Sequence, residues 1–595
     1  MFQSFEVTTH PEDGPPRLEE LRDLMARIDV QALLVPRADA HQGEDVAPRD
    51  NRLAWLTGFT GSAGFAVVLP DIAGVFVDGR YRVQVKEQVA ACYTPVDWPE
   101  NMPGPWLAES MPTGGRLAFD PWLHTFHEIE ALAEAGIVLV PSPNLIDVIW
   151  TDRPDAPAGA VTLHPLEQSG EASSLKRSRL AAQLREDGHS TAVLSQPASI
   201  CWLLNIRGED IARTPVVQAF ALLHDDGRVA LYSDTPDLMA MAPTLGPGIT
   251  CFERDAFGEA LAGLDGPVRV DRNSAPWAVS QILEATSVPI EYAPDICALP
   301  KAQKNETEIS GSRAAHLRDG AAMCEFLAWL DVEAPKGRLT EIDVVTALEG
   351  FRRNTGLLRD ISFETICGSG PNGAIVHYRV NKNSNRVISP GELLLVDSGG
   401  QYQDGTTDIT RTIAVGEVQA EAKMCFTRVL QGMIAISRVR FPTGVTGRDL
   451  DALARMPLWL AGQDYDHGTG HGVGAYLGVH EGPQAISRRN NVPLRAGMIL
   501  SNEPGYYREG AFGIRIENLI VTQNATDIPG GDGRAMLAFE TLTWVPIDRR
   551  LIDLELLSAD ERRWLDSYHA DVFDKIAPAL SKPALDWLRD VTAAL

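Results

Sequence analysis

Four acidic side chains in strand-like settings constrain the fold of this chain more than any other feature of its sequence. Asp397 ends an apolar run at residues 393–396, and Asp408 follows it closely. Glu503 and Glu517 stand in two later segments with the same strand-like character. Because aspartate is disfavoured in strands, the first pair, considered alone, fits best beside turns. A common site for all four residues therefore has to be judged from their neighbours.

The sequence between the two aspartates predicts a hairpin. A buried strand ends in Asp397, and the pair Asp404-Gly405 is typical of the turn before a returning strand. A two-residue turn there places Asp397 opposite Thr412, so that Asp397 and Asp408 are not direct cross-strand neighbours. An irregularity at residues 398–400, with the sequence Ser-Gly-Gly, is one way to bring the two carboxylates together.

Three of the 13 histidines, His467, His471 and His480, lie close together in the sequence. The first two are four residues apart, but glycines at 468, 470, 472 and 474 argue against a helical zinc pair. Glycines beside a histidine let the backbone approach something closely, which fits a metal or the main chain of a substrate. The clustering favours a functional site over isolated structural histidines.

The segment 512–521 predicts a strand with charged residues on one face. Strand periodicity puts Arg515 and Glu517 on one side and Ile514 and Ile516 on the other. Considered alone, Arg515 and Glu517 are also compatible with a solvated pair at the surface.

Taken together, these segments predict a dinuclear hydrolase. They supply four carboxylates and one imidazole: Asp397, Asp408, His471, Glu503 and Glu517. Four negative charges balance two divalent cations. A ligand set dominated by oxygens suits Mn²⁺, Co²⁺ or Fe²⁺, and it differs from a closed zinc–thiolate site. Two metals can hold a hydroxide between them at neutral pH and polarise a carbonyl group, as amide hydrolysis requires.

The composition excludes several classes of protein. The formal net charge is −27, which argues against nucleic acid as a partner because phosphate binding needs a basic surface. No apolar run is long enough to span a bilayer, and residues 1–14 lack the features of a secretory signal or transit peptide. Seven dispersed cysteines indicate neither disulfides nor a zinc-thiolate site. We therefore expect a cytoplasmic protein without membrane contact.

The length of 595 residues predicts several domains. Linker-like stretches at 152–159 and 300–305 divide the chain into three segments, residues 1–155, 156–304 and 305–595. The first two have a mixed α/β pattern, and each contains a Trp-Leu pair, at residues 55–56 and 202–203. The shared pattern suggests a duplication, although two unrelated α/β domains would look much the same. The third segment opens with a capping box at residues 305–308.

At these residues the sequence resembles the pita-bread metallopeptidases, the family of methionine aminopeptidase, prolidase and aminopeptidase P. The ligand order Asp, Asp, His, Glu, Glu matches the family pattern at every position. The matching local motifs are Asp397-Ser-Gly, Asp408-Ile-Thr-Arg411, His467-Gly-Thr-Gly-His471, Glu503-Pro-Gly and Arg515-Ile-Glu517-Asn518. The whole length resembles the three-domain Xaa-Pro aminopeptidases of the cytosolic type.

The resemblance implies an α/β (α+β) fold. It implies two related creatinase-like α/β domains, residues 1–155 and 156–304. A pita-bread catalytic domain with a curved, mainly antiparallel sheet is expected to follow at residues 305–595.

The resemblance also implies a role for each site residue. Asp397 would bind one metal with both oxygens, Asp408 and Glu517 would bridge, and His471 would bind the second metal. Glu503 would bind that second metal and act as general base. Substrate contacts would come from His377, His467, His480, Tyr507 and Arg515. Of these, His377 and His480 would support the tetrahedral intermediate, while the others would surround the pocket for the proline.

The activity implied is hydrolysis of the first peptide bond of peptides with proline in second position. Two divalent ions are expected, with Mn²⁺ first and Co²⁺, Zn²⁺ or Fe²⁺ as alternatives. A homodimer is expected as well, and Trp459 lies in a region similar to a family dimer contact, although an ordinary core position fits it equally. The alternatives are a prolidase, which cleaves only dipeptides, and a non-catalytic pita-bread peptide-binding module; the metal-free creatinase type conflicts with the intact ligand set.

Overall fold

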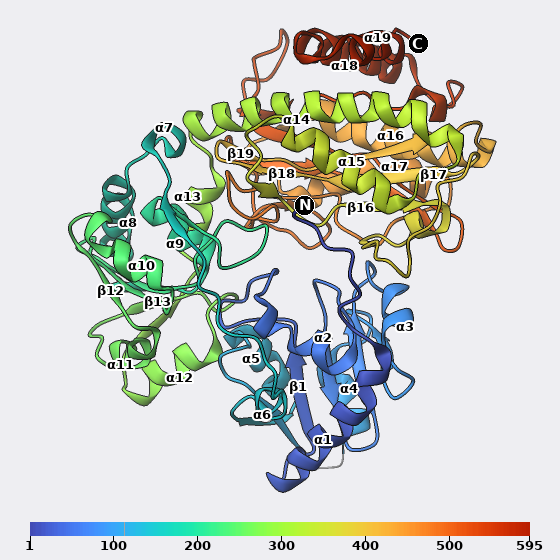
Figure 1. Ribbon diagram of the computed structural model, residues 1–595. Coiled ribbons are helices and arrows are strands. Elements are labelled where there is room, and N and C mark those ends of the chain that lie inside the picture. The colour runs from blue at the N-terminus through green and yellow to red at the C-terminus, as the bar shows by residue number, and fades with distance from the viewer. Residues whose placement is uncertain (112–113) are drawn as a thin grey trace. The chain divides into compact units, whose positions relative to one another are not determined.

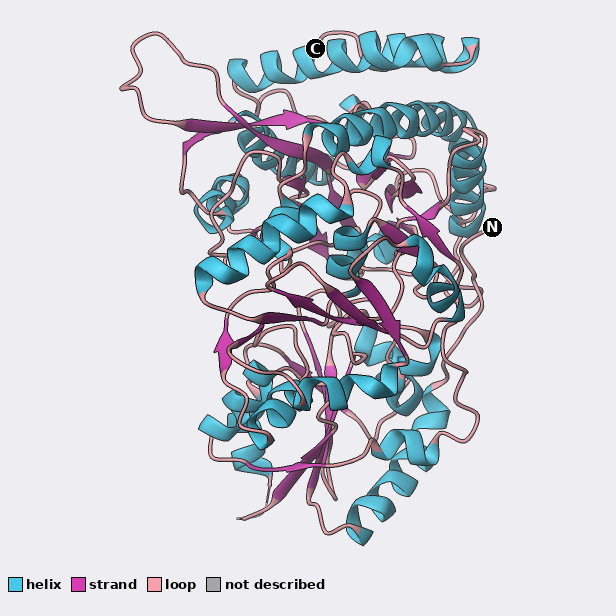
Figure 2. Ribbon diagram, turned by 90° about the vertical axis from the view of Figure 1, so that its left-hand side faces the viewer, coloured by secondary structure: helices cyan, strands magenta, loops and turns pink. Residues whose placement is uncertain are grey.

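The computed structural model describes residues 1–111 and 114–595. The chain forms two compact units, one of Thr8–Lys301 and one that joins Met1–Val7 to Ala302–Leu595. Helices and strands are mixed within each unit (Figures 1 and 2), as the sequence predicts.

The unit Thr8–Lys301 contains two six-stranded sheets with the same topology. The first has the order β4-β3-β2-β1-β5-β6 and the second the order β12-β11-β10-β8-β13-β14. In both, one central strand, β1 or β8, pairs antiparallel on one side and parallel on the other. The first sheet consists of β1 (Ala32–Pro36), β2 (Phe65–Val68), β3 (Ala73–Val77), β4 (Thr94–Asp97), β5 (Arg116–Phe119) and β6 (Val138–Pro141). The second consists of β8 (Thr191–Leu194), β10 (Phe220–His224), β11 (Val229–Tyr232), β12 (Ile249–Phe252), β13 (Val268–Val270) and β14 (Ile290–Tyr292).

Helices cover both sheets, because side chains on the two faces of each central strand are apolar. Leu33 and Val35 belong to one hydrophobic cluster, whereas Ala32 and Leu34 belong to another on the opposite face. The helices of this unit are α1 (Gly14–Arg27), α2 (Arg52–Thr57), α3 (Gln84–Gln88), α4 (Pro103–Ser110), α5 (Phe126–Glu134), α6 (Leu145–Ile149), α7 (Leu166–Ser169), α8 (Ser173–Asp187), α9 (Pro197–Leu204), α10 (Pro236–Met241), α11 (Phe257–Ala262) and α12 (Trp277–Ala285).

The two Trp-Leu pairs occupy equivalent places in this repeated topology. Trp55 lies in α2 and Trp202 in α9, and each helix follows the central strand of its sheet. Both helices end in a left-handed residue, Gly58 with φ 85° and Asn205 with φ 52°. The expectation of two related α/β domains is therefore confirmed.

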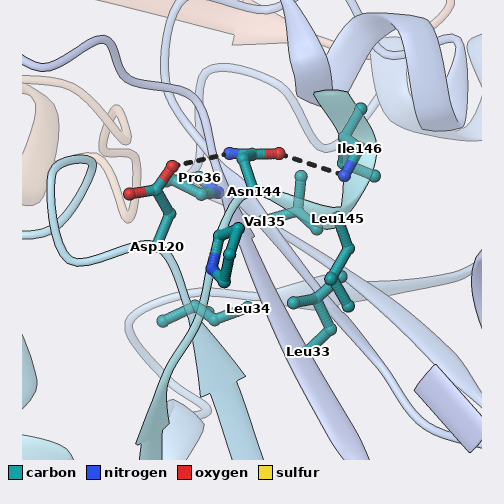
Figure 3. A pocket seen from close by; sticks show the side chains of 9 residues that line it. Leu33, Leu34, Val35, Pro36, Asp120, Asn144, Leu145 and Ile146 are labelled. Carbon is teal, nitrogen blue, oxygen red and sulfur yellow. Dashed lines mark hydrogen bonds between the residues drawn. The ribbon is translucent and has the colours of Figure 1, made fainter. Parts of the chain in front are cut away.

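A small pocket in this unit lies between β1 and the start of α6 (Figure 3). The Asn144 side chain donates to Asp120 Oδ2 at 3.0 Å and accepts from the Ile146 N–H at 3.0 Å. The second contact caps the N-terminus of α6, so Asn144 in the pocket wall has a structural role.

All strand pairings in the described part of the unit Ala302–Leu595 are antiparallel, as expected for its sheet. The strands that carry the site are β16 (Ile366–Ser369), β17 (Leu393–Ser398), β18 (Gly400–Tyr402), β19 (Gly405–Thr406), β20 (Ile409–Ala414), β22 (Gly470–His471), β23 (Ala485–Ile486), β24 (Ile499–Asn502), β25 (Gly505–Arg508), β26 (Phe512–Arg515) and β27 (Asn518–Asn524). The remaining strands are β15 (Asp360–Ile361), β21 (Arg440–Pro442) and β28 (Met536–Thr541).

Long helices pack against these strands and enclose a large hydrophobic core. They are α14 (Glu306–Glu333), α15 (Glu341–Arg353), α16 (Ala420–Arg438) and α17 (Gly447–Trp459). Two further helices, α18 (Ala559–Ile576) and α19 (Lys582–Val591), pack on the outside of α14 (Figure 1). The predicted capping box is present, since Asn305 and Glu308 exchange hydrogen bonds at the start of α14.

Two further findings concern apolar helices and the cysteines. No helix in the part of the chain that the structure describes is long and apolar enough to cross a membrane. The cysteines are free thiols, and five of the seven are buried.

Candidate active site

The five residues expected to bind metal lie at strand ends or in breaks between strands. Asp397 lies in β17, Asp408 immediately precedes β20, and His471 ends β22. Glu503 follows β24, and Glu517 lies between β26 and β27. Residues 512–521, predicted as one strand, are thus split at Glu517, whose N–H bonds to the carbonyl of a third strand at Thr410. Such breaks re-aim side chains and let several strands contribute to one site.

The hairpin that connects the two aspartates differs from the predicted one. Its turn is formed by Gln403 and Asp404 rather than by Asp404 and Gly405. Gly405 instead packs against α14, where a Cβ atom would lie 3.0 Å from the Cα of Ser312. The Asp-Gly pair therefore reflects close packing against a helix and not the turn itself.

The shifted register also changes how the aspartates approach each other. Asp397 lies opposite Thr410 instead of Thr412, so that Asp408 is its diagonal neighbour. Diagonal neighbours are about 7–8 Å apart between Cα atoms, close enough for both carboxylates to bind the same two metal ions. The register is the same on both sides of Gly399, so no inserted residue is needed to bring the carboxylates together.

Three of the predicted ligands form a compact cluster. One ligand atom from each of Asp408, His471 and Glu517 lies within 4.8 Å of the others. His471 Nε2 is 3.4 Å from Asp408 Oδ2 and 3.5 Å from Glu503 Oε1. Asp397 belongs to the same charged group, because the charges of Asp408 and Glu503 both raise its pKa.

The buried oxygens of this cluster fit divalent cations. Asp397 Oδ1, Asp408 Oδ1 and Glu517 Oε1 are buried and lack a hydrogen-bond partner among the described residues. Leaving such oxygens unsatisfied is costly, and bound cations would satisfy all three. The donors are mostly carboxylate oxygens with one imidazole nitrogen, a set that suits divalent ions such as Mn²⁺.

The carboxylates strongly disfavour one another's charge when no cation is present. Burial, together with Asp408 and Glu503 and against the opposing effect of Arg515, raises the pKa of Asp397 to about 7. Burial likewise raises the pKa of Glu503, and it raises that of Glu517 well above the ordinary range. A site that concentrates negative charge in this way attracts positive ions.

Hydrogen bonds from neighbouring residues orient the ligands. Thr410 Oγ1 donates to Glu517 Oε2 at 2.8 Å, and Ser501 Oγ donates to Glu503 Oε1 at 3.0 Å. His471 Nδ1 donates to the Gly472 carbonyl at 2.9 Å, so that Nε2 is directed at the carboxylates and, in the neutral ring, is the nitrogen without a proton. The neutral imidazole is thereby held in the tautomer that binds a metal.

Arg515 links the ligand cluster to the predicted proline pocket. Its Nη2 is 2.6 Å from Asp397 Oδ2, and its Nη1 donates to the Tyr507 hydroxyl at 2.6 Å. Tyr507 donates in turn to His467 Nε2 at 2.9 Å, because His467 Nδ1 is bonded to the Gly468 carbonyl. Arg515 and Glu517 are each 1% exposed, which excludes a solvated surface pair.

The two histidines expected to support the intermediate lie in different loops. His480 is exposed, and its ring contacts the ring of His471 edge-on, with centroids 4.2 Å apart. It also lowers the pKa of Glu503, so it lies near that carboxylate. His377 is partly buried in the turn after Gly370–Ala374. His480 is thus in ring contact with a predicted ligand.

Two of the glycines beside His471 are required by packing within the protein. A Cβ atom on Gly470 would lie 1.9 Å from the Ser501 carbonyl oxygen, and one on Gly472 would lie 2.1 Å from that of Glu481. These glycines therefore allow close approach of the protein's own backbone, while approach of a metal or substrate main chain stays a prediction.

Sequence reasoning missed a buried carboxylate behind the His377 loop. Glu341, at the start of α15, is fully buried and accepts hydrogen bonds from Ser369 N, Asn372 Nδ2, Tyr378 Oη and Arg386 N. Acidic residues are common in the first turn of a helix, so the sequence carried no signal of this network.

Sequence reasoning also missed a role for Arg411, which belongs to the motif Asp408-Ile-Thr-Arg411. The guanidinium is buried and donates to the carbonyl oxygens of Thr410, Glu517, Val545 and Pro546. It thus fixes the backbone on both sides of the Thr410–Glu517 contact. The Asp-Ile-Thr-Arg motif was the available signal, but only the fold reveals these acceptors.

Comparison with known proteins follows the same division of the chain. Residues 17–149 and 152–308 each match the Creatinase/Prolidase N-terminal domain, residues 310–524 match metallopeptidase family M24, and residues 535–595 match the C-terminal region of peptidase M24. A protein of Laccaria bicolor named "Probable Xaa-Pro aminopeptidase P" is 38% identical, over 98% of this chain and 93% of its own length.

Solved structures give the same result for the fold. The X-prolyl aminopeptidase of Caenorhabditis elegans, described as a cytosolic enzyme with a di-nuclear active site, superposes with a TM-score of 0.92 and 32% identity, over 98% of this chain and 99% of that one. A Xaa-Pro dipeptidase from Bacillus anthracis shares the fold over only 63% of this chain, with a TM-score of 0.51 and 24% identity.

The chain therefore belongs to metallopeptidase family M24, with two creatinase-type domains before its catalytic domain. Within that family it is similar along its whole length to the proteins named Xaa-Pro aminopeptidase P. It is a metal-dependent peptidase.

Proposed function

We propose that this metallopeptidase is a cytoplasmic Xaa-Pro aminopeptidase, which removes the first residue of peptides that carry proline in second position. The observation that carries the proposal is a buried carboxylate cluster with unsatisfied oxygens, in a chain that matches an X-prolyl aminopeptidase over 98% of its length. A dipeptidase is the weaker alternative, since the similarity to one extends over 63% of the chain.

The metal ligands proposed are Asp397, Asp408, His471, Glu503 and Glu517, and the proposed occupants are two Mn²⁺ ions. When bound, such a pair polarises the substrate carbonyl and supplies a water nucleophile at neutral pH. The carboxylates would share their charge between the two ions, and Thr410 and Ser501 would hold two of them in place.

Glu503, His377 and His480 are proposed to act on the reacting atoms. Glu503 would take up the proton of the nucleophile at its carboxylate, which Ser501 holds in place. His480, beside Glu503 and His471, would donate a hydrogen bond to the carbonyl oxygen as negative charge develops. His377 would support the same oxygen from its loop.

The pocket for proline is proposed to consist of His467, Tyr507 and Arg515. Their hydrogen bonds to one another keep these side chains rigid. A proline nitrogen has no N–H to donate, and its φ angle is fixed, so recognition has to come from the shape of the ring and from the residues around it. A preformed pocket meets that requirement.

Three wider features are also proposals. The domains extend over residues 1–155, 156–304 and 305–595, close to the ranges matched by the family domains. The enzyme acts in the cytoplasm without nucleic acid or membrane partners, consistent with its net charge of −27. It forms a homodimer through the surface that carries Trp459.

The substrate class can be tested with two peptides and the purified enzyme in Mn²⁺. We predict release of arginine from an Arg-Pro-Pro peptide at a higher kcat/KM than cleavage of the dipeptide Gly-Pro, as followed by mass spectrometry. A peptide with alanine in second position serves as the matched control and is expected to be cleaved poorly. Cleavage of Gly-Pro alone would identify a prolidase instead.

A further inference from the structure

One buried ion pair lies directly beside the His480 loop and has no part in the mechanism above. Lys304 Nζ is in contact with Glu481 Oε1, and the two side chains are 1% and 3% exposed. A buried charge is costly unless it is paired, so the fold has a reason to keep these two groups together. Glu481 immediately follows His480 in the chain.

The backbone at Lys304 and at its two neighbours is fixed by contacts of its own. Its N–H bonds to the Gly497 carbonyl at 3.0 Å, and Gln303 forms a bridge with Met498. The next residue, Asn305, caps α14 through two backbone N–H groups. The backbone of Lys304 is therefore fixed between β24 and the first turn of a 28-residue helix.

The glutamate closes the loop that carries His480. The Glu481 N–H donates to the Gly472 carbonyl at 2.8 Å, and the Gly472 N–H donates to the Gln484 carbonyl at 3.2 Å. A Cβ atom on Gly472 would lie 2.1 Å from the carbonyl oxygen of Glu481, so the two backbones are in close contact. Gly472 directly follows the ligand His471.

We propose that Lys304 and Glu481 are positioning residues that hold the His480 ring beside His471 and Glu503. The ion pair anchors the loop at the residue next to His480, which is otherwise exposed. A lysine from the segment that leads into the catalytic domain thus sets the place of a residue that acts on substrate. This inference rests on the proposed role of His480.

If the ion pair positions His480, its loss should lower turnover and leave the binding of substrate and metal nearly unchanged. Two of the metal ligands, Glu517 and Glu503, are held by hydrogen bonds from Thr410 and Ser501, which do not involve the ion pair. Displacement of His480 by even an ångström weakens a contact made to the developing oxyanion, which lowers kcat. Metal affinity and KM are expected to change little.

The first test replaces Lys304 by methionine, which keeps the length of the side chain and removes its charge. We expect kcat for the Arg-Pro-Pro peptide to fall about tenfold or more, with KM and Mn²⁺ affinity within about threefold of the wild type. The matched control is Lys336→Met, which removes an exposed lysine paired with Glu333 in the same unit and should leave kcat unchanged. Wild-type turnover in Lys304→Met would overturn the proposal.

Two double variants separate positioning from simple loss of stability. Lys304→Met combined with Glu481→Gln removes both charges, so thermal stability should largely recover while kcat stays low; recovery of kcat together with stability would show a purely structural pair and overturn the proposal. In a His480→Ala background, Lys304→Met should lower kcat by less than about twofold, because its effect passes through His480. A full additional loss there would also overturn it.

These measurements distinguish the inference from the proposed function. If the wild-type enzyme fails to cleave the Arg-Pro-Pro peptide, the proposed function is wrong. If the wild type cleaves it and Lys304→Met does so equally well, only the positioning role is wrong.

Discussion

At the scale of single residues, the site is a place where carboxylates are forced together away from water. Asp397, Asp408 and Glu517 each bury an oxygen that has no donor among the described residues. Burial and the neighbouring carboxylates raise the pKa values of Asp397, Glu503 and Glu517, so the metal-free protein holds protons that metals would replace. Residue types and spacing indicated these residues as candidate ligands, and the structure brings Asp408, His471 and Glu517 together, but metal binding by the set stays a prediction.

The metal-free protein should therefore lose stability as pH rises. Burial raises the pKa of Asp397 to about 7 in the folded state, whereas an aspartate in the unfolded chain titrates near about 3.9. The folded state thus binds this proton more tightly, and the free energy of unfolding falls as pH increases between these values. We expect a lower Tm at about pH 8 than at about pH 6 in chelator, and a larger gain from Mn²⁺ at the higher pH.

The control for this titration is Asp397→Asn, which cannot ionise. Its metal-free Tm should depend less on pH over the same interval. A metal-free wild type with the same Tm at both pH values would contradict the account.

At the scale of elements, the positions of turns and breaks decide which side chains meet. The Asp-Gly pair suggested a turn at residues 404–405, yet the turn lies one residue earlier because Gly405 packs closely on α14. Tertiary packing of this kind cannot be read from local sequence, and the shift moved Asp397 from Thr412 to Thr410. The break at Glu517 was missed for the same reason, since it depends on the neighbouring strand β20.

A second element-scale feature is the network that Glu341 forms behind the His377 loop. Its carboxylate accepts from Ser369, Asn372, Tyr378 and Arg386, so a glutamine there would turn an N–H group toward donors. We predict that Glu341→Gln lowers the free energy of unfolding by about 1–3 kcal/mol and also lowers kcat, as measured by denaturant unfolding and steady-state kinetics.

The matched control for this network is Glu333→Gln, which removes an exposed carboxylate paired with Lys336. It should change both quantities very little. If Glu341→Gln matched this control in stability and kcat, the network would have no influence on the loop.

At the scale of the whole molecule, the chain combines a repeated N-terminal fold with a single catalytic unit. The two six-stranded sheets share one topology, and the Trp-Leu pairs that suggested the duplication lie on equivalent helices. The sequence could indicate repetition but not the strand order, which depends on pairings between distant segments. Trp459 is 44% exposed, which excludes the core position that the sequence left open.

The proposed dimer is tested at this exposed tryptophan. Met456, Trp459 and Leu460 lie at i, i+3 and i+4 near the end of α17 and are 53%, 44% and 84% exposed, so they form one apolar patch. We expect Trp459→Glu to convert a dimer to a monomer in light scattering, because a charge there opposes burial of the patch. A dimer that persists in this variant would place the contact elsewhere.

The central claim is that two metal ions held by this cluster perform the hydrolysis, and metal content measured alongside activity tests it most directly. After reconstitution with Mn²⁺, elemental analysis should find two ions per chain in the wild type. Asp408→Asn should bind fewer ions and lose hydrolysis of the Arg-Pro-Pro peptide, while its circular dichroism remains that of a folded protein. Full hydrolysis by the metal-stripped enzyme, or by Asp408→Asn, would contradict the account.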